Sequence, residues 1–387
     1  MDAIPSLKKP RGKAWRLLKA CGVVAFAFAA MGLLVALALN LSFLNPVAQT
    51  MKGFSLTDIY YHVLQEYGTA DTSRVVTIVD MTDLTDRGRI ADVLGEIDSL
   101  HPKGIGVDIV FEGWKPDTLG DMRMMEVADG CNSVVFSYRL RDYVNDSIGY
   151  AEETHSFFAD VVPVKEGFTN YERSLYGGIK RTANLALRGG GVERHSFVYE
   201  LAQIYTDGHL KHGLQDLNIN FRTTVFRVIP ADSVRFYADY IRDHIVLYGA
   251  YREMNDMHYT PLGEIPGIEL LAYSIQTLLE QTEVHHPSLL VTIVMSFLVV
   301  LVTYIWRSKY LQWAKSRKSG WVSYFLTTTF VVGLLMFIWT AVLVGVAFLI
   351  FCLTGVSLNL GWALGAIPFL GGAKEFFSLT ARSSLGK

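Results

Sequence analysis

Two aspartates lie where a ligand site in an α/β protein is most often found. Asp80 ends the apolar, β-branched run 74–80, and Asp108 interrupts the apolar run 104–111. Each run predicts a buried strand, and ligands of open α/β sheets bind outside the carboxyl ends of the strands. We expect the two strands to be adjacent, so that both carboxylates lie at the same edge of the sheet. Asp80 and Asp108 are therefore candidate ligand-binding residues.

Three further charged residues extend this candidate site. Glu112 follows the second strand, and Arg252 and Asp256 lie after the apolar run 244–249. Loops that follow neighbouring parallel strands meet at one edge of the sheet. The sequence thus predicts an acid-rich pocket for a cation or for a basic or amine-bearing ligand.

A structural role is the alternative for both aspartates. An aspartate at a strand end often caps the next helix or accepts hydrogen bonds from loop amides. A buried Asp108 would also need a cationic partner. Arg87, Arg89 and Arg252 are the candidates for that partner.

Other chemical signals are weak. Asp80, Asp83 and Asp86 are spaced three apart, but they lack the alternation, central glycine and terminal glutamate of a calcium loop. His285 and His286 are adjacent, so on a helix they would point in different directions. No nucleophile elbow, phosphate loop, zinc-protease motif or cysteine metal set is present. We therefore predict no enzyme activity, no cofactor and no metal.

The elements that position these residues alternate between strand and helix. Apolar residues at helical spacing over 90–100 follow the first strand, and Pro102 ends that helix. A helix is predicted over 118–129 and a strand over 133–137. Such alternation predicts parallel strands joined by right-handed crossovers. The fold class is therefore α/β, with a mainly parallel sheet covered by helices.

The second half of the mixed segment repeats this pattern. It predicts hairpins or long loops over 143–194, a helix over 196–206 and strands over 219–225 and 244–249. A last helix over 266–279 is expected to continue through 280–287 into a membrane span.

Glycine and proline mark the turns near this last helix. Gly249 is expected to allow a tight turn after its strand. Pro261 and Gly267 belong to pairs that bracket the turn before the helix, and Glu269 lies in its first turn. These residues are predicted to have backbone roles.

Uncharged stretches long enough to cross a bilayer flank the mixed segment. Residues 20–39 and 324–353 carry no charge, and about twenty apolar residues cross the hydrocarbon core. Residues 292–306 reach this length only together with 287–291. The predicted plan is a basic cytoplasmic N-terminus (1–19), span one (20–44), an extracytoplasmic domain (45–287), span two (288–306), a basic cytoplasmic loop (307–320), span three (321–353), a short glycine-rich span four (356–373) and a cytoplasmic tail (374–387).

Charge sets the expected orientation. The net charge of −2 conceals basic segments at 1–19, 307–318 and 374–387 around a strongly acidic middle. Lys and Arg in short loops mark the cytoplasmic side. We therefore expect both termini in the cytoplasm, and a domain outside the cytoplasmic membrane of a bacterium. The basic clusters are expected to touch anionic lipid rather than nucleic acid.

Cysteine and glycine usage bear on assembly. Cys131 is the only cysteine between the predicted spans one and two, so no disulfide within that domain is possible. The pair Gly361 and Gly365 has the spacing that allows close helix approach. Such packing could lie within the four-span region or form a homo-oligomer.

The residues in these strands resemble a known family. Residues 75–111, ending in "P-x-x-I-G-x-D-I-x-F", look like the opening of a CHASE2 domain. The segments 166–170 and 178–181 resemble its middle block, and 244–249 with Asp256 and 260–269 resembles its closing block. One span before the domain and three after it complete the likeness.

The resemblance implies an extracytoplasmic sensory domain. Family members usually carry a cytoplasmic output domain, whereas only residues 374–387 follow the predicted fourth span. Two functions are open on this basis. One is a sensor that signals to a separate cytoplasmic or membrane protein, and the other is a scaffold subunit of a membrane complex. An extracytoplasmic enzyme that uses the acidic site is a weaker alternative.

Overall fold

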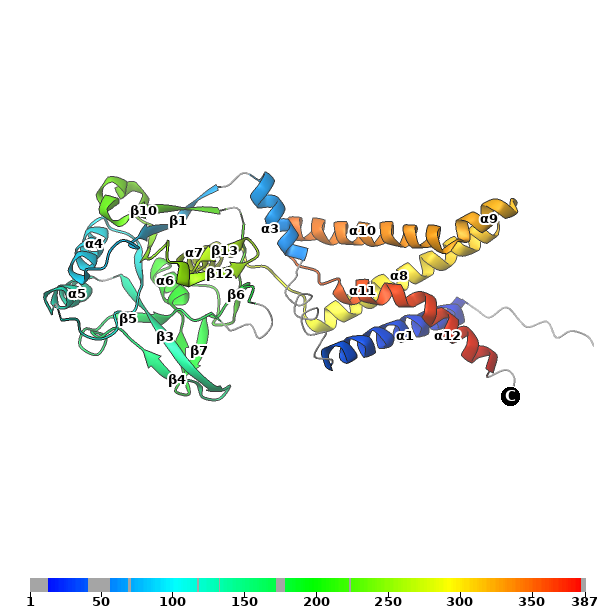
Figure 1. Cartoon of the computed structure of the whole chain (residues 1–387), viewed down its shortest axis with the longest axis horizontal. Helices are drawn as coiled ribbons and strands as arrows, with labels where there is room; N and C mark the ends of the chain where they lie inside the picture. Colours follow the sequence, from blue (N-terminus) through cyan, green and yellow to red (C-terminus); the bar gives the residue numbers. More distant parts are fainter. Residues whose placement is uncertain are drawn as a thin grey trace, which may run out of the picture. The chain divides into compact units, whose positions relative to one another are not determined.

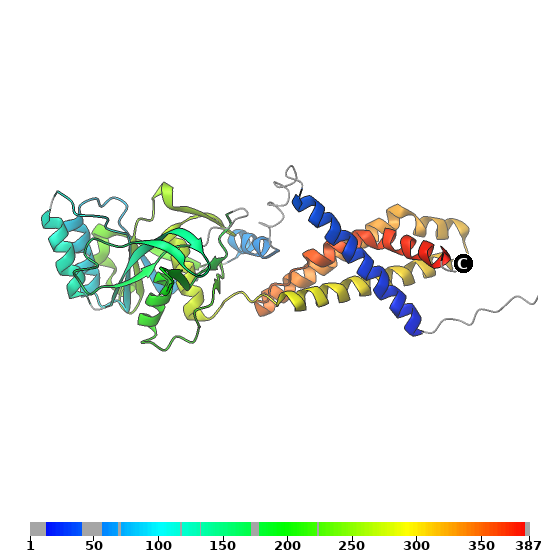
Figure 2. The same cartoon turned by 90° about the horizontal axis from the view of Figure 1, so that it is seen from below.

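The computed structural model describes residues 13–40, 56–68, 71–116, 118–131, 133–171, 178–222 and 224–383. The chain divides into a globular unit, Thr57–Val284, and a helical unit, Met1–Leu56 with His285–Lys387. Both are drawn in Figures 1 and 2. The predicted boundaries at residues 44 and 45 lie outside the described residues.

A mixed sheet forms the centre of the globular unit. Its parallel part has the order β10-β1-β11-β2-β3, with β5 also paired to β3. The strands are β1 (Asp71–Asp80), β2 (Gly104–Asp108), β3 (Val134–Asn145), β5 (Lys165–Phe168), β10 (Thr224–Pro230) and β11 (Ile245–Gly249). The predicted alternation of strand and helix is confirmed.

Helices cover both faces of this sheet. On one face are α4 (Arg87–Ser99), α5 (Thr118–Gly130) and η2 (Ala231–Tyr240), and α6 (Phe197–Tyr205) and α7 (Gly267–Glu280) pack on the other. In both views α4 and α5 lie side by side (Figures 1 and 2). Asp86 caps α4 and Ser196 caps α6, each accepting from a backbone N–H in the first turn. The apolar side chains buried beneath α4 and α5 include Val79, Ile90, Leu94, Ile97, Ile105, Val107, Met124, Phe136 and Tyr248.

The edge beyond β3 consists of two antiparallel hairpins. Hairpins or long loops were predicted over 143–194. β3 continues past the predicted end at residue 137 and pairs with β4 (Gly149–Thr154). A second hairpin joins β7 (Ala186–Gly189) and β8 (Val192–His195), and a parallel pairing of β4 with β7 joins the two hairpins. The alternation of buried Tyr138 and Leu140 with exposed Arg139 shows that one face of this extension is solvated.

The strand predicted over 219–225 overlaps the observed strand only at residues 224 and 225. The pairing lies instead in the two-residue β9 (Leu217–Asn218) and in β10, which starts at Thr224. Ile219 and Phe221 are buried but belong to neither strand. Their apolar character reflects side-chain packing rather than sheet pairing, and periodicity alone does not separate the two.

The predicted continuous helix from residue 266 into span two was also wrong. α7 ends where Gln281 adopts left-handed dihedrals (φ 54°, ψ 39°), and α8 begins only at Leu289. Within the globular unit, the Glu283 carboxylate accepts hydrogen bonds from the Asn218 backbone and side chain. In the helical unit, Ser288 caps α8. A hydrogen-bonded linker therefore separates the two helices.

The helical unit contains three helices long and apolar enough to cross a membrane. These are residues Lys13–Leu33 within α1 (Lys13–Asn40), α8 (Leu289–Lys315) and α10 (Thr329–Thr354). α8 extends beyond the predicted end of span two at residue 306. α9 (Gly320–Thr327) is separate from α10 because the Thr328 side chain caps the latter.

The segment predicted as span four is helical from Gly361 onwards. It comprises α11 (Gly361–Ala366), η4 (Ile367–Phe369) and the start of α12 (Leu370–Ser383), which follow one another without a gap. No single one of these helices reaches the length that a bilayer requires. The fourth span and the membrane topology therefore stay predictions. A Cβ on Gly365 would collide with Met31 of α1, so this glycine provides close packing inside the helical unit.

A glycine of β2 gives a first testable prediction. A Cβ on Gly106 would lie 2.6 Å from both Leu201 and Phe197 of α6, which are buried. Gly106→Ala is expected to lower the free energy of unfolding by about 1–3 kcal/mol through overpacking. Gly95→Ala is the control, because its Cβ would be 3.9 Å from Val127. Denaturant unfolding checks this, and equal stability of the two variants would contradict it.

Candidate functional site

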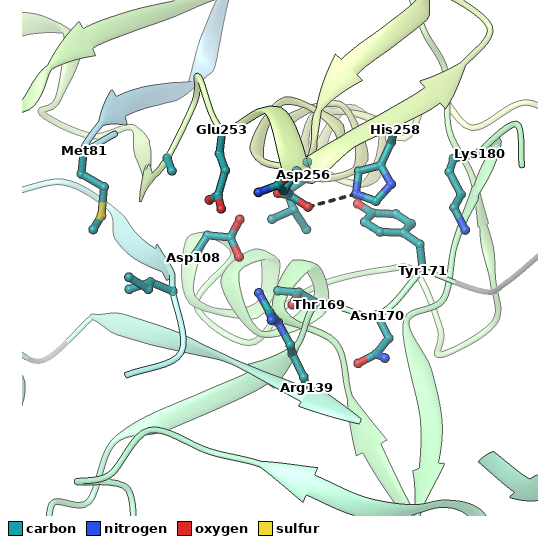
Figure 3. Close-up of a pocket in the computed structure, with 15 residues that line it drawn as sticks. Met81, Asp108, Arg139, Thr169, Asn170, Tyr171, Lys180, Glu253, Asp256 and His258 are labelled. Atoms are coloured by element: carbon teal, nitrogen blue, oxygen red, sulfur yellow. Dashed lines mark ion pairs between the residues drawn. The ribbon is translucent and has the colours of Figure 1, made fainter. Parts of the chain in front are cut away.

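A polar cavity of about 480 Å³ opens at the carboxyl ends of β1, β11 and β2. Figure 3 shows the acidic Asp108, Glu253 and Asp256 grouped across from the Arg139 guanidinium. Asp108 comes from the last position of β2, Arg139 from β3, and the other two from the loop after β11. A cavity therefore lies at the edge of the sheet where a pocket was predicted, but the residues that line it differ from the predicted site residues.

Asp80 and Asp108 do not lie on adjacent strands, contrary to the prediction. β11 lies between β1 and β2, and its Gly249 pairs with Asp80 on one side and with Asp108 on the other. Two strand spacings put the backbones of the aspartates about 10 Å apart. β11 comes from far along the chain, so local sequence could not place it between its neighbours.

Gly249 has a packing role rather than the predicted tight turn. Its φ is not positive. A Cβ there would lie 2.9 Å from Ile268 and 3.1 Å from the Asp108 Cβ. The missing side chain therefore lets α7 and Asp108 approach the end of β11.

Asp80 organises the loop after β11. Its carboxylate accepts hydrogen bonds from the backbone N–H groups of Thr82 and Tyr251, at 2.9 and 3.1 Å, and from the Arg252 Nε at 2.9 Å. Burial acts to raise the pKa of Asp80, but these hydrogen bonds and that of the Thr82 hydroxyl outweigh burial and lower the pKa. Neither Asp80 nor Arg252 lines the cavity.

The cationic partners predicted for Asp108 are engaged elsewhere. Arg87 pairs with Asp121, Arg89 with Asp232, and Arg252 with Asp80 and Asp83. The Asp108 carboxylate makes no hydrogen bond or ion pair within the described part of the chain. Arg139 and His258 are the cationic groups that act on it.

Glu112 lies outside the cavity. Its exposed carboxylate accepts a hydrogen bond from Arg141 at 3.1 Å, and its backbone carbonyl accepts one from Arg87 at 3.0 Å. Glu112, in the loop after β2, is therefore linked to β3 and to α4.

Asp256 sits against the first turn of α7. A Cβ on Gly267 would collide with the Asp256 carboxylate, so glycine is required for this approach. The carboxylate also pairs with His258 Nε2 at 3.4 Å. Negative charge at a helix N-terminus is stabilised by the helix dipole. The predicted turn around Pro261 is a hairpin of β12 (Met257–Thr260) and β13 (Gly263–Pro266).

Burial is the largest influence on the pKa of Asp108. It raises the pKa of Asp108 to about 7, and the negative charge of Asp256 adds to the rise. The charges of Arg139 and His258 act in the opposite direction. Burial likewise raises the pKa of Tyr171, whose hydroxyl lies 3.1 Å from the Ser274 hydroxyl of α7. The cavity thus holds a carboxyl group that titrates near neutral pH.

The Asn170 side chain binds β3, which forms the side of the cavity opposite α7. Its side chain accepts from the Leu140 N–H and donates to the Leu140 carbonyl, both at 2.8 Å, which continues the β5–β3 pairing. This amide therefore holds β3 where Arg139 faces the cavity (Figure 3).

Several residues that line the cavity were not predicted from the sequence. The alternation of apolar and charged residues after residue 137 could have extended β3 and placed Arg139 on its polar face. No local sequence pattern predicts the other residues, because they lie in irregular loops and in the hairpin of β12 and β13. The missed residues are Arg139, Tyr171, Lys180, Glu253 and His258.

Metal binding finds no support among the described residues, which contain no cluster of three His, Cys, Asp or Glu side chains able to hold an ion. Asp80 and Asp83 share Arg252, and Asp86 caps α4. These three aspartates therefore have structural partners.

Comparison with known proteins gives one match. The family model described as "CHASE2 domain" matches residues 28–306. No curated protein and no solved structure matches the chain. The matched range takes in the globular unit, together with all but the last nine residues of α8.

Proposed function

The chain belongs to the CHASE2 domain family of extracytoplasmic sensory domains, and we propose that its globular unit binds a small zwitterionic ligand in the cavity beside β2. Apolar helices of the other unit make it a membrane protein. The proposal places the globular unit outside the cytoplasmic membrane of a bacterium.

Opposite charges across the cavity are the observation that supports this ligand class. The Asp108 carboxylate makes no hydrogen bond or ion pair with any described residue, and Glu253 and Asp256 lie beside it. Arg139 faces them (Figure 3). A ligand amine would pair with Asp108 and a ligand carboxylate with Arg139, because charge-assisted hydrogen bonds are the strong ones. A volume of about 480 Å³ is within the usual range for small-molecule sites.

The raised pKa of Asp108 makes binding pH-dependent. An amine pairs with the ionised carboxylate, and this form is lost as the pH falls below about 7. Affinity is therefore expected to fall as the pH is lowered from 8 to 6. Asp108→Asn lacks the carboxylate at every pH, so it should bind the ligand weakly at both pH 8 and pH 6.

α7 offers a route from the cavity to the membrane. Gly267 and Leu271 line the cavity at the beginning of α7, and the linker 281–288 follows its end. A ligand transmits a signal only if it favours one of two arrangements of this helix. The proposed route runs through the linker into α8 and to a separate cytoplasmic or membrane protein.

Thermal unfolding of the full-length protein tests the ligand proposal. The probes are glycine, a dipeptide and lysine, beside ethylamine and acetate, which carry one charge each. A zwitterion at one hundred times its Kd should stabilise the protein by about 2.7 kcal/mol. Arg139→Gln and Asp108→Asn should lose this effect, while Arg141→Gln and Glu112→Gln, which alter residues outside the cavity, should keep it. Equal shifts with ethylamine or acetate alone would contradict a zwitterionic ligand.

The scaffold alternative is favoured by one feature of α10. Gly345 has no atom within 4 Å of where a Cβ would be, and α10 is largely exposed within the chain. Small residues on an exposed membrane helix suit packing against another copy or a partner. Purification in mild detergent followed by mass spectrometry separates the functions. A stoichiometric membrane partner favours the scaffold, and a cytoplasmic kinase or cyclase favours the sensor.

A further inference from the structure

Arg307 of α8 lies in a cavity without an acidic partner. The cavity, of about 450 Å³, is open to the surface and is lined by α8, Thr327 of α9, α10 and the segment from Ile367 to Gly371. The Arg307 Nε is buried without a hydrogen-bond partner, and the guanidinium makes no ion pair within the described residues. A partly buried charge without a counter-charge is costly. An anion bound here would supply the counter-charge that the described residues do not.

Other cations converge on the same region of the helical unit. Burial lowers the pKa of Lys374, which lies in α12 beyond the predicted spans, and the charges of Arg307, Lys315 and Lys19 lower it further. These residues belong to α12, α8 and α1, so three helices bring positive charge together. No acid is among the described residues that line the cavity. Mutual repulsion of this kind is relieved by a bound anion.

Aromatic residues indicate the depth of the cavity in a bilayer. Trp306 precedes Arg307 and stacks on Trp339 of α10, with ring centroids 5.4 Å apart. Tyr310 and Trp313 follow on α8. Trp and Tyr are enriched at the membrane–water interface, where lipid headgroups lie. The remaining lining includes threonines and apolar side chains, which suits a group that is polar at one end and apolar at the other.

We propose that this cavity binds the phosphate of an anionic lipid headgroup, with Arg307 as its principal contact. Guanidinium groups bind phosphate oxygens in pairs of parallel hydrogen bonds. The apolar lining, such as Leu311 and Phe337, would contact the lipid beyond the phosphate. The inference is independent of the ligand proposed for the globular unit.

Native mass spectrometry of the delipidated full-length protein tests this site. The probes are phosphatidylglycerol and phosphatidylcholine with identical acyl chains. Wild type should retain phosphatidylglycerol in preference. Arg307→Gln should bind it at least about tenfold more weakly, the effect of losing a charge-assisted hydrogen bond. Lys309→Gln removes the same charge from an exposed position of the same helix and should bind as wild type.

Two further measurements separate the possible outcomes. Arg307→Lys, which keeps the charge but not the paired donors, should bind with intermediate affinity, and this guards against misfolding of the glutamine variant. Millimolar inorganic phosphate should compete poorly if the lipid is the source of the anion, and displacement by it would identify free phosphate instead. Equal retention of phosphatidylglycerol by wild type, Arg307→Gln and Lys309→Gln would overturn the proposal, as would equal binding of the two lipids.

Discussion

Asp121→Ala is expected to lower the free energy of unfolding of the globular unit by about 3–5 kcal/mol, because it leaves a buried guanidinium without its counter-charge. Asp121 is 0% exposed and Arg87 is 6% exposed, and they pair between α5 and α4. The Arg87 guanidinium also donates to the backbone carbonyls of Gly113 and Glu112, at 2.8 and 3.0 Å. The pair therefore anchors the loop after β2 as well as the two helices.

A matched control joins the same two helices on their exposed side. Arg123 of α5 pairs with Asp92 of α4 at 3.0 Å, with both side chains about half exposed. Asp92→Ala is expected to cost less than about 1 kcal/mol, as exposed ion pairs usually do. Denaturant unfolding of the full-length protein in detergent compares the two variants. Equal losses from Asp121→Ala and Asp92→Ala would refute the buried-pair argument.

The effect of Asp121→Ala should also depend on pH. Burial acts to raise the pKa of Asp121, but hydrogen bonds from Arg87 and from the Lys115 backbone outweigh burial and lower the pKa. A carboxyl group whose folded-state pKa is lowered stabilises the protein above its unfolded-state pKa. This contribution is lost as the pH falls through the folded-state pKa. The difference between variant and wild type should therefore shrink in acid.

The alternating elements were predictable because local patterns specify them. The helical spacing from Ile90 to Leu100, the break at Pro102 and the apolar run 104–111 each indicate their structure within a few residues. The strand order was not predictable, because β11 is inserted between β1 and β2 by packing of distant segments. This insertion is why Asp80 and Asp108 have different environments despite similar sequence contexts.

The candidate site was predictable only in part for the same reason. Asp108 and Asp256 line the cavity, whereas Asp80, Glu112 and Arg252 bind neighbouring loops or strands. Whether a carboxylate at a strand end faces a cavity or a loop amide depends on the conformation of the following loop. That conformation is set here by residues more than a hundred positions apart in sequence, such as Asp80 and Tyr251.

The buried pair Arg87–Asp121 could not be predicted from the sequence. Both residues lie at the starts of helices that read as ordinary amphipathic segments, where charged residues are usually exposed. Their burial results from the packing of α4 against α5 and from Phe111 and Phe157, whose rings lie 5.7 and 4.9 Å from the guanidinium. Only the tertiary arrangement creates this environment.

Asp108→Asn is expected to stabilise the globular unit at pH 8, and by only about a third as much at pH 5. Burial raises the folded-state pKa of Asp108 to about 7, while an unfolded aspartate has a pKa of about 3.9. Between these values the folded state binds more protons, so stability falls as the pH rises. Asparagine removes this dependence.

The expected gain at pH 8 is about 1–2 kcal/mol, less than the full linkage because the side chain is partly exposed to solvent. Asp80→Asn is the matched control at the same sheet edge. Its pKa is lowered, so its replacement should destabilise the protein at pH 8. Thermal unfolding at both pH values measures the two effects, and a loss of stability by Asp108→Asn at pH 8 would contradict the argument. A destabilising carboxylate beside Arg139 in an open cavity fits the ligand site that we propose, because functional sites often carry groups that are unfavourable for stability.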